Sequence, residues 1–98
     1  MVVGILTIEL FIPYHQTIKE RRNLLRSLKD MIRKKFNVSV SEIVDSQEKI
    51  NGRAKIAVAA VSGEASYLQS VLGNVYNLVD NFHGDKILSH KTEIIQYE

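Results

Sequence analysis

Hydrophobic periodicity divides this chain into six segments, and their order most constrains the fold. Two segments repeat apolar side chains every three or four positions, as amphipathic helices do: residues 17–36 and 64–82. Four segments follow the period of two that is typical of strands: residues 2–12, 38–45, 53–61 and 86–97. The order is therefore strand, helix, strand, strand, helix, strand.

This order predicts a ferredoxin-like α+β fold, β-α-β-β-α-β. Right-handed crossovers give a four-stranded antiparallel sheet with two helices on one face and the first and third strands in the centre. Asn51-Gly52 predicts the turn before the third strand, and Gly84 the end of the second helix. Residues 1–98 form a single domain, large enough for one modest core.

Positive charge is concentrated in the first predicted helix. Residues 17–36 carry eight basic and two acidic side chains, a net charge of +6, whereas the whole chain carries +2 and the remainder therefore −4. Thr17 and Glu20 form a capping-box pattern at the helix start, yet cations crowd its first turns. Cations there oppose the helix dipole at a cost of about 0.3–1 kcal/mol each. Local rules broken in this way favour a functional surface.

Basic residues recur at helical spacing along this segment, on a face different from the apolar one. We predict that they contact the phosphates of a nucleic acid: Lys19, Arg21, Arg22, Arg26, Lys29 and Arg33. A simpler interpretation remains open, in which the helix only presents a well-hydrated surface.

The predicted sheet has a largely aliphatic face opposite the helices. Only Phe11 is aromatic on it, which disfavours stacking of RNA bases there. An aliphatic face is expected to be covered by a second copy or a protein partner. The candidate residues of a homodimer interface are Val3, Ile5, Phe11, Ala57, Ala59 and Val61. The alternative is a partly exposed face, flanked by polar side chains.

Sequence signals for catalysis or cofactors are absent. His15, His83 and His90 are scattered without a second ligand at metal-binding spacing, and the five glycines form no phosphate-binding loop. No nucleophile–base pattern is evident, so we expect a non-enzymatic protein without metal or cofactor. The lack of cysteine fits a reducing cytoplasm, and no apolar run reaches the length of a membrane span.

Several short segments resemble the YlxP-like family (domain of unknown function 503), a group of small bacterial proteins. The resemblance rests on Val2-Val3-Gly4-Ile5-Leu6, Ile12-Pro13, Thr17-Ile18-Lys19-Glu20-Arg21-Arg22 and Phe36-Asn37-Val38-Ser39-Val40-Ser41-Glu42. It implies a ferredoxin-like fold and a loose link to translation and ribosome-assembly genes. It implies no established activity.

Two hypotheses about function follow. The first is a non-enzymatic RNA- or ribosome-associated factor that contacts phosphates through the basic helix, with RNA or a ribosomal particle as its partner. The alternative is a dimeric ferredoxin-like binding module that pairs through its open sheet face and recognises a small anionic ligand or a protein partner. Binding that weakens steeply with salt distinguishes the first hypothesis from the second.

Overall fold

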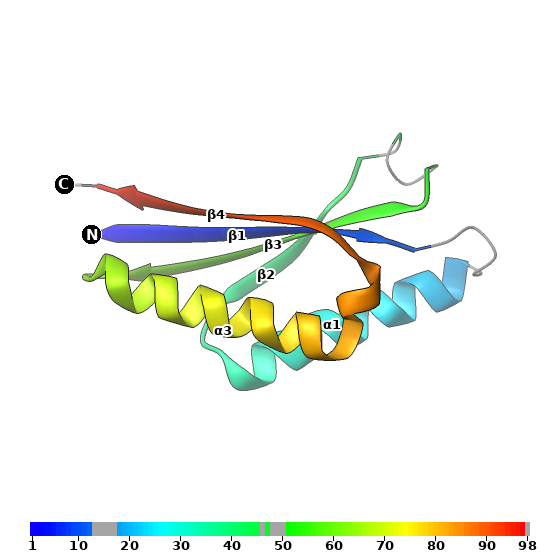
Figure 1. Cartoon of the computed structure of the whole chain (residues 1–98), viewed down its shortest axis with the longest axis horizontal. Helices are drawn as coiled ribbons and strands as arrows, with labels where there is room; N and C mark the ends of the chain where they lie inside the picture. The colour runs from blue at the N-terminus through cyan, green and yellow to red at the C-terminus, as the bar shows by residue number, and fades with distance from the viewer. Residues whose placement is uncertain (13–17, 46, 48–50, 98) are drawn as a thin grey trace.

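The computed structural model describes residues 1–12, 18–45, 47 and 51–97. Its elements, in chain order, are β1 (Val2–Phe11), α1 (Ile18–Lys35), β2 (Ser39–Ile43), β3 (Arg53–Ser62), α3 (Ala65–His83), η1 (Gly84–Lys86) and β4 (Ile87–Gln96) (Figure 1). The predicted order is confirmed. The second strand ends at Ile43, earlier than the predicted residue 45, and the 3₁₀ turn η1 was not predicted. The capping box involves Thr17, which lies outside the described residues.

The four strands form one antiparallel sheet in the order β2-β3-β1-β4. Both helices lie on the same face of this sheet (Figure 1). The predicted ferredoxin-like fold is therefore confirmed, with the first and third strands in the centre. β1 pairs with β3 and with β4 along nearly its whole length, so it is the strand around which the sheet is built.

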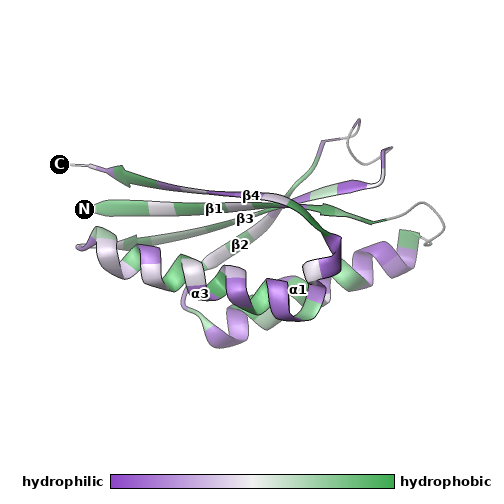
Figure 2. Cartoon of the chain, viewed as in Figure 1, coloured by the Kyte–Doolittle hydropathy of each residue, from purple (hydrophilic) through white to green (hydrophobic). Residues whose placement is uncertain are grey.

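The core is made of buried residues from the strands and from both helices, which cover one face of the sheet (Figure 1). Along α1 and α3 hydrophobic and hydrophilic residues alternate, as expected of helices with one face on the core (Figure 2). Alternate residues of β1 point into it, and Leu6, Ile8 and Leu10 are at most 1% exposed. The residues that α1 and α3 contribute to the buried set are Leu25, Leu28, Ile32, Leu68, Leu72, Val75, Leu78 and Val79. Gly4 lets α3 approach β1 closely, because a Cβ atom there would lie 2.8 Å from Leu72 Cδ1.

Two apolar residues of the predicted helical stripes are exposed to solvent. Ile18 is 66% exposed and Phe82 is 64% exposed. Both lie in terminal turns, at the first residue of α1 and next to the last residue of α3. The apolar period continues there although the core has ended, so periodicity identified the correct face but not the length over which it is buried.

Gly52 and Gly84 lie where glycines were predicted to end or turn a segment, but their backbone conformations differ. Gly52 has a φ of 78°, in the left-handed region that glycine favours, at the predicted turn. Gly84 follows the end of α3 as predicted, but its φ of −57° is right-handed and leads into η1. A Cβ atom at Gly84 would lie 2.8 Å from Asp80 Oδ1, the end of an exposed side chain that can turn away.

Replacing Leu28 with alanine tests the placement of the core. Leu28 is 2% exposed and belongs to the main hydrophobic cluster. We expect Leu28→Ala to lower the free energy of unfolding by about 2–5 kcal/mol, through lost burial and the remaining cavity. Ser27→Ala, on the exposed face of the same helix, should change it by less than ~0.5 kcal/mol in the same urea titration. If both variants lowered the free energy of unfolding by the same small amount, α1 would have to be rotated differently about its axis.

Candidate nucleic-acid interface

The rotation of α1 is fixed by its buried residues, and this decides where each cation points. Leu25, Leu28 and Ile32 face the sheet. At 100° per residue, the predicted basic residues then lie on the flank of the helix and not on one uniform surface. Two of them, Arg21 and Arg33, contact the strand side of the molecule, and the others face outward.

Arg21 points inward from the first turns of α1. Its Nη1 lies 3.4 Å from Glu42 Oε2, and its Nη2 donates a hydrogen bond to the carbonyl oxygen of Arg53 at 3.1 Å. The side chain is only 14% exposed, and its buried Nε has no partner among the described residues. Arg21 therefore connects α1 to β2 and β3, and little of its charge is presented to a ligand.

Arg33 lies against the free edge of β2. Its Nη2 donates a hydrogen bond to the carbonyl oxygen of Val40 at 2.8 Å, and its Nη1 lies 3.8 Å from Asp30 Oδ1. The register of β2 with β3 places this carbonyl on the outer side of β2. Arg33 thus satisfies an acceptor of the sheet edge, although its side chain stays 49% exposed.

The remaining predicted cations are available on the surface. Lys19, Arg22 and Arg26 are exposed, and Lys29 is partly buried. None of the four forms an ion pair or hydrogen bond with the part of the chain that the structure describes. The structure therefore divides the predicted set into four outward cations and two that stabilise the contact between α1 and the sheet.

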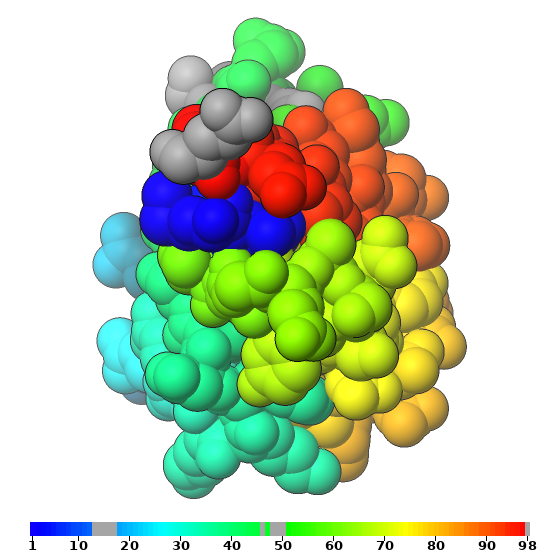
Figure 3. All heavy atoms as spheres, turned by 90° about the vertical axis from the view of Figure 1, so that its left-hand side faces the viewer, coloured from blue at the N-terminus to red at the C-terminus, as the bar shows by residue number. Residues whose placement is uncertain are grey.

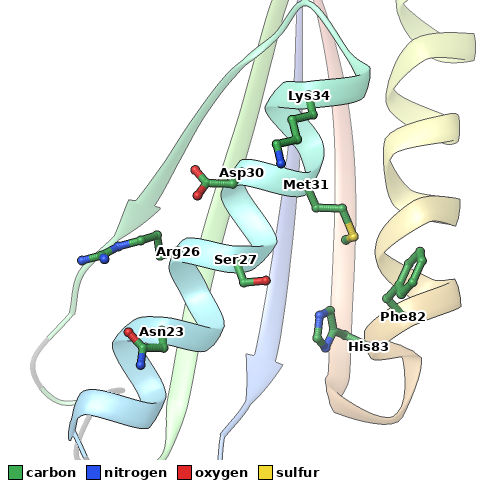
Figure 4. A pocket seen from close by; sticks show the side chains of 8 residues that line it. All are labelled: Asn23, Arg26, Ser27, Asp30, Met31, Lys34, Phe82 and His83. Atoms are coloured by element: carbon green, nitrogen blue, oxygen red, sulfur yellow. The ribbon is translucent and has the colours of Figure 1, made fainter.

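A shallow groove of about 650 Å³ runs between α1 and the end of α3 (Figure 4). Its lining comprises Asn23, Arg26, Ser27, Asp30, Met31, Lys34, Phe82 and His83. Met31 projects toward α3 in this view, whereas Arg26 points away from it. Sequence reasoning did not assign Lys34 or Phe82 to a site. Lys34 could have been assigned to the site from its position in the basic helix. The contribution of Phe82 could not have been predicted, because it depends on how α3 packs beside α1.

His83 forms part of this groove without adding positive charge to it at neutral pH. Its Nδ1 is buried and has no partner among the described residues. Burial lowers the pKa of His83 below its ordinary value, and the nearby Lys86 ammonium lowers it further, whereas Asp85 opposes the shift. Lys34 is therefore the cation of the lining on which an anion between the two helices would chiefly depend, since Arg26 points away from α3 (Figure 4).

The predicted interface residues all lie on the sheet face opposite the helices, but they do not form one patch. Val3, Ile5, Ala59 and Val61 are neighbours at one end, according to the pairing register. Ile95 lies beside Val3 and extends this patch, which the sequence analysis missed. Ala57 is next along β3, opposite Thr7. Phe11 is at the far end, beyond the 3.6 Å ion pair between Lys55 and Glu9.

The described residues also bear on two other kinds of site. Among residues 1–12, 18–45, 47 and 51–97, no group of three His, Cys, Asp or Glu side chains could hold a metal ion. No helix in these same ranges is long and apolar enough to cross a membrane.

A double-mutant cycle tests the structural role of Arg21. We expect Arg21→Met to lower the free energy of unfolding by about 1–3 kcal/mol, because Glu42 and the Arg53 carbonyl lose a charged donor. Arg22→Met, at the next position but facing outward, should change it by less than ~0.5 kcal/mol. Urea titrations of Arg21→Met, Glu42→Gln and the double variant give the coupling between the two side chains. Additive losses would show that they act independently.

Comparison with known proteins supports the fold and identifies the family. The designed protein "De novo designed protein Foldit4" matches with a TM-score of 0.59 and 12% identity, over 99% of this chain and 98% of that chain. The At3g17210 protein from Arabidopsis thaliana matches with a TM-score of 0.54 and 5% identity, over 98% and 95% of the two chains. At such identities the likeness shows the fold alone.

The comparison with curated proteins found no match. The model of the family described as "Protein of unknown function (DUF503)" matches residues 3–92, nearly the whole chain. This confirms the membership of domain of unknown function 503 that the sequence motifs had indicated. The chain belongs to the DUF503 family.

Proposed function

We propose that this protein is a non-enzymatic RNA-binding factor that contacts phosphates through the outward cations of α1. The observation that supports the proposal most directly is that Lys19, Arg22, Arg26 and Lys29 lack anionic partners in the described part of the chain. Unpaired cations along one helical flank suit a polyanion, since each can neutralise a phosphate and release its counterions.

The length of this flank fits a short run of nucleic-acid backbone. The helical rise places Lys19 and Lys29 about 15 Å apart along the axis of α1. Successive cations three or four residues apart are about 5–6 Å from one another. Such contacts would position the protein without reading the base sequence.

The proposal includes a ribosomal particle as a natural RNA partner and the cytoplasm as the location. It assigns Arg21 and Arg33 a supporting role only. Both guanidinium groups already have acceptors within the protein, so contact with a phosphate would compete with the attachment of α1 to the sheet. RNA binding therefore depends chiefly on the four cations that face outward.

A second candidate is the dimeric binding module that pairs through the open face of the sheet. It is favoured by the aliphatic patch of Val3, Ile5, Ala59, Val61 and Ile95, in which Val61 is 65% exposed. This patch occupies only one end of the face, because Glu9 and Lys55 interrupt it. Such a module would bind an anionic ligand or protein as a dimer.

A salt titration of RNA binding tests the first proposal. Arg22→Ala and Arg26→Ala should each weaken binding to RNAs of different sequence alike. Each lost contact should also flatten the slope of log affinity against log salt by about 0.7–0.9. Arg53→Ala is the matched control, since it removes one exposed cation from the opposite sheet face. Fluorescence anisotropy with a labelled RNA measures both quantities.

Unchanged affinity and slope in the Arg22→Ala/Arg26→Ala variant would contradict phosphate binding by α1. An equal effect of Arg53→Ala would show that only the overall charge matters. Co-sedimentation with separated ribosomal subunits would then identify the particle, if the slopes behave as expected.

Light scattering tests the second candidate. Ile5→Glu places a charge within the aliphatic patch and should convert a face-to-face dimer into a monomer at high micromolar concentration. Phe11→Glu, at the other end of the same face, is the matched control and should leave that dimer intact. A wild-type monomer, or a dimer indifferent to Ile5→Glu, would exclude this interface.

A further inference from the structure

The hydrogen bonds between β4 and β1 determine which backbone groups of β4 point away from β1, toward the outer edge of the sheet. Tyr97 N–H donates to the carbonyl oxygen of Met1 at 2.8 Å, and the Met1 ammonium donates to the carbonyl oxygen of Tyr97 at 3.2 Å. Figure 3 shows the start of β1, in blue, beside the end of β4, in red. In an antiparallel sheet, the N–H and C=O groups of successive residues point alternately to one side of the strand and to the other. Because those of Tyr97 point to β1, the groups that point outward from β4 are those of His90, Thr92, Ile94 and Gln96.

This edge is long and regular. Within the described chain, β4 pairs with β1 alone, and the register is uninterrupted from Ser89 to Gln96. The side chains of His90 and Thr92 point to the helix side, and the His90 ring packs against Tyr76 of α3 with ring centroids 4.0 Å apart, yet both residues remain exposed. An uncovered strand edge is a template for pairing with another chain.

The opposite edge of the sheet, formed by β2, is shorter than the β4 edge and is partly occupied. β2 spans only Ser39–Ile43, and the Arg33 guanidinium occupies its outward Val40 carbonyl. Pairing of a second strand there would displace this hydrogen bond. Of the two edges, β4 is therefore the one that offers unoccupied backbone groups over a long stretch.

We propose that β4 is a homodimerisation edge, which pairs antiparallel with β4 of a second copy about a two-fold axis at Thr92. This register matches the outward groups of both strands, with Thr92 opposite Thr92 and His90 opposite Ile94. It also places Lys91 of each copy opposite Glu93 of the other. Both side chains lie on the open face of the sheet and are 73% and 47% exposed. Within each copy Lys91 Nζ already lies 3.5 Å from Glu93 Oε1, so the proposed register would bring two such pairs together with opposite charges facing each other.

Electrostatics select this register over its neighbours. A shift of two residues in one direction brings Lys91 opposite its own counterpart, and the reverse shift does the same for Glu93. Opposite charges on facing positions stabilise a strand pair, whereas like charges destabilise it. Larger shifts reduce the regular overlap, which in the proposed register covers residues 89–95 of both copies.

The resulting dimer would extend the sheet continuously through both copies, with all helices on one face. A strand-edge contact is a small interface, so we expect a weak dimer that dissociates on dilution. The inference does not depend on RNA binding, and it differs from the face-to-face dimer considered above, since no residue of the aliphatic patch is on the two-fold axis.

A charge-swap experiment on the full chain tests the proposal. Sedimentation equilibrium from micromolar to millimolar concentration should show a monomer–dimer equilibrium for the wild type. Lys91→Glu and Glu93→Lys should each weaken it by about tenfold, because each replaces two attractive pairs with two repulsive pairs. The double variant Lys91→Glu/Glu93→Lys should restore wild-type association. Lys35→Glu, an exposed charge reversal on α1, should have little effect.

Thr92→Pro provides an independent variant. It removes an outward N–H at the two-fold axis but none that pairs with β1, so dimerisation should be lost while the circular dichroism spectrum is retained. A wild-type monomer throughout the concentration range would overturn the proposal. So would a dimer that tolerates Lys91→Glu, or a double variant that remains as weak as the single ones.

Discussion

The burial of one stripe of α1 against the sheet determines much of the rest of the structure. Leu25, Leu28 and Ile32 are at most 2% exposed, and their side chains fix the rotation of the helix about its axis. Arg21 is four residues before Leu25 and therefore lies on the buried side, whereas Arg22 is turned by a further 100°. One rotation thus decides which arginine is a structural group and which is available to a ligand.

A cation on the buried side requires a partner, because an unpaired guanidinium loses hydration without compensation. Glu42 and the Arg53 carbonyl provide it for Arg21. Arg33 lies on the flank of the helix and stays 49% exposed, but its guanidinium also donates to the Val40 carbonyl. These contacts come from β2 and from the first residue of β3. They join the most basic helix to the shortest strand, and the Arg33 contact occupies one carbonyl of a sheet edge that would otherwise remain open.

Periodicity was sufficient to predict the fold, since each segment has one clear period and the crossover rule leaves few topologies. It was less informative at segment ends: Ile18 and Phe82 continue an apolar pattern beyond the core. For the candidate interface, the spacing of basic residues did not separate Arg21 from Arg22. The separation of four positions between Arg21 and Leu25 was a usable signal, because it places Arg21 on the buried side of α1. Its partner Glu42 was not predictable, because the packing of α1 against β2 brings together residues that are 21 positions apart in the sequence.

The two proposed surfaces lie on opposite sides of the molecule, so they are compatible. α1 contacts β2 and α3 contacts β4, and the sheet order places β2 and β4 at opposite edges. Pairing of two β4 strands would leave each α1 at an outer end of the joined sheets. A short RNA could then engage only one helix, whereas a longer RNA could reach both and gain affinity through the high effective concentration of the second site. Dimerisation would in this way make affinity depend on RNA length without any additional contact to the bases.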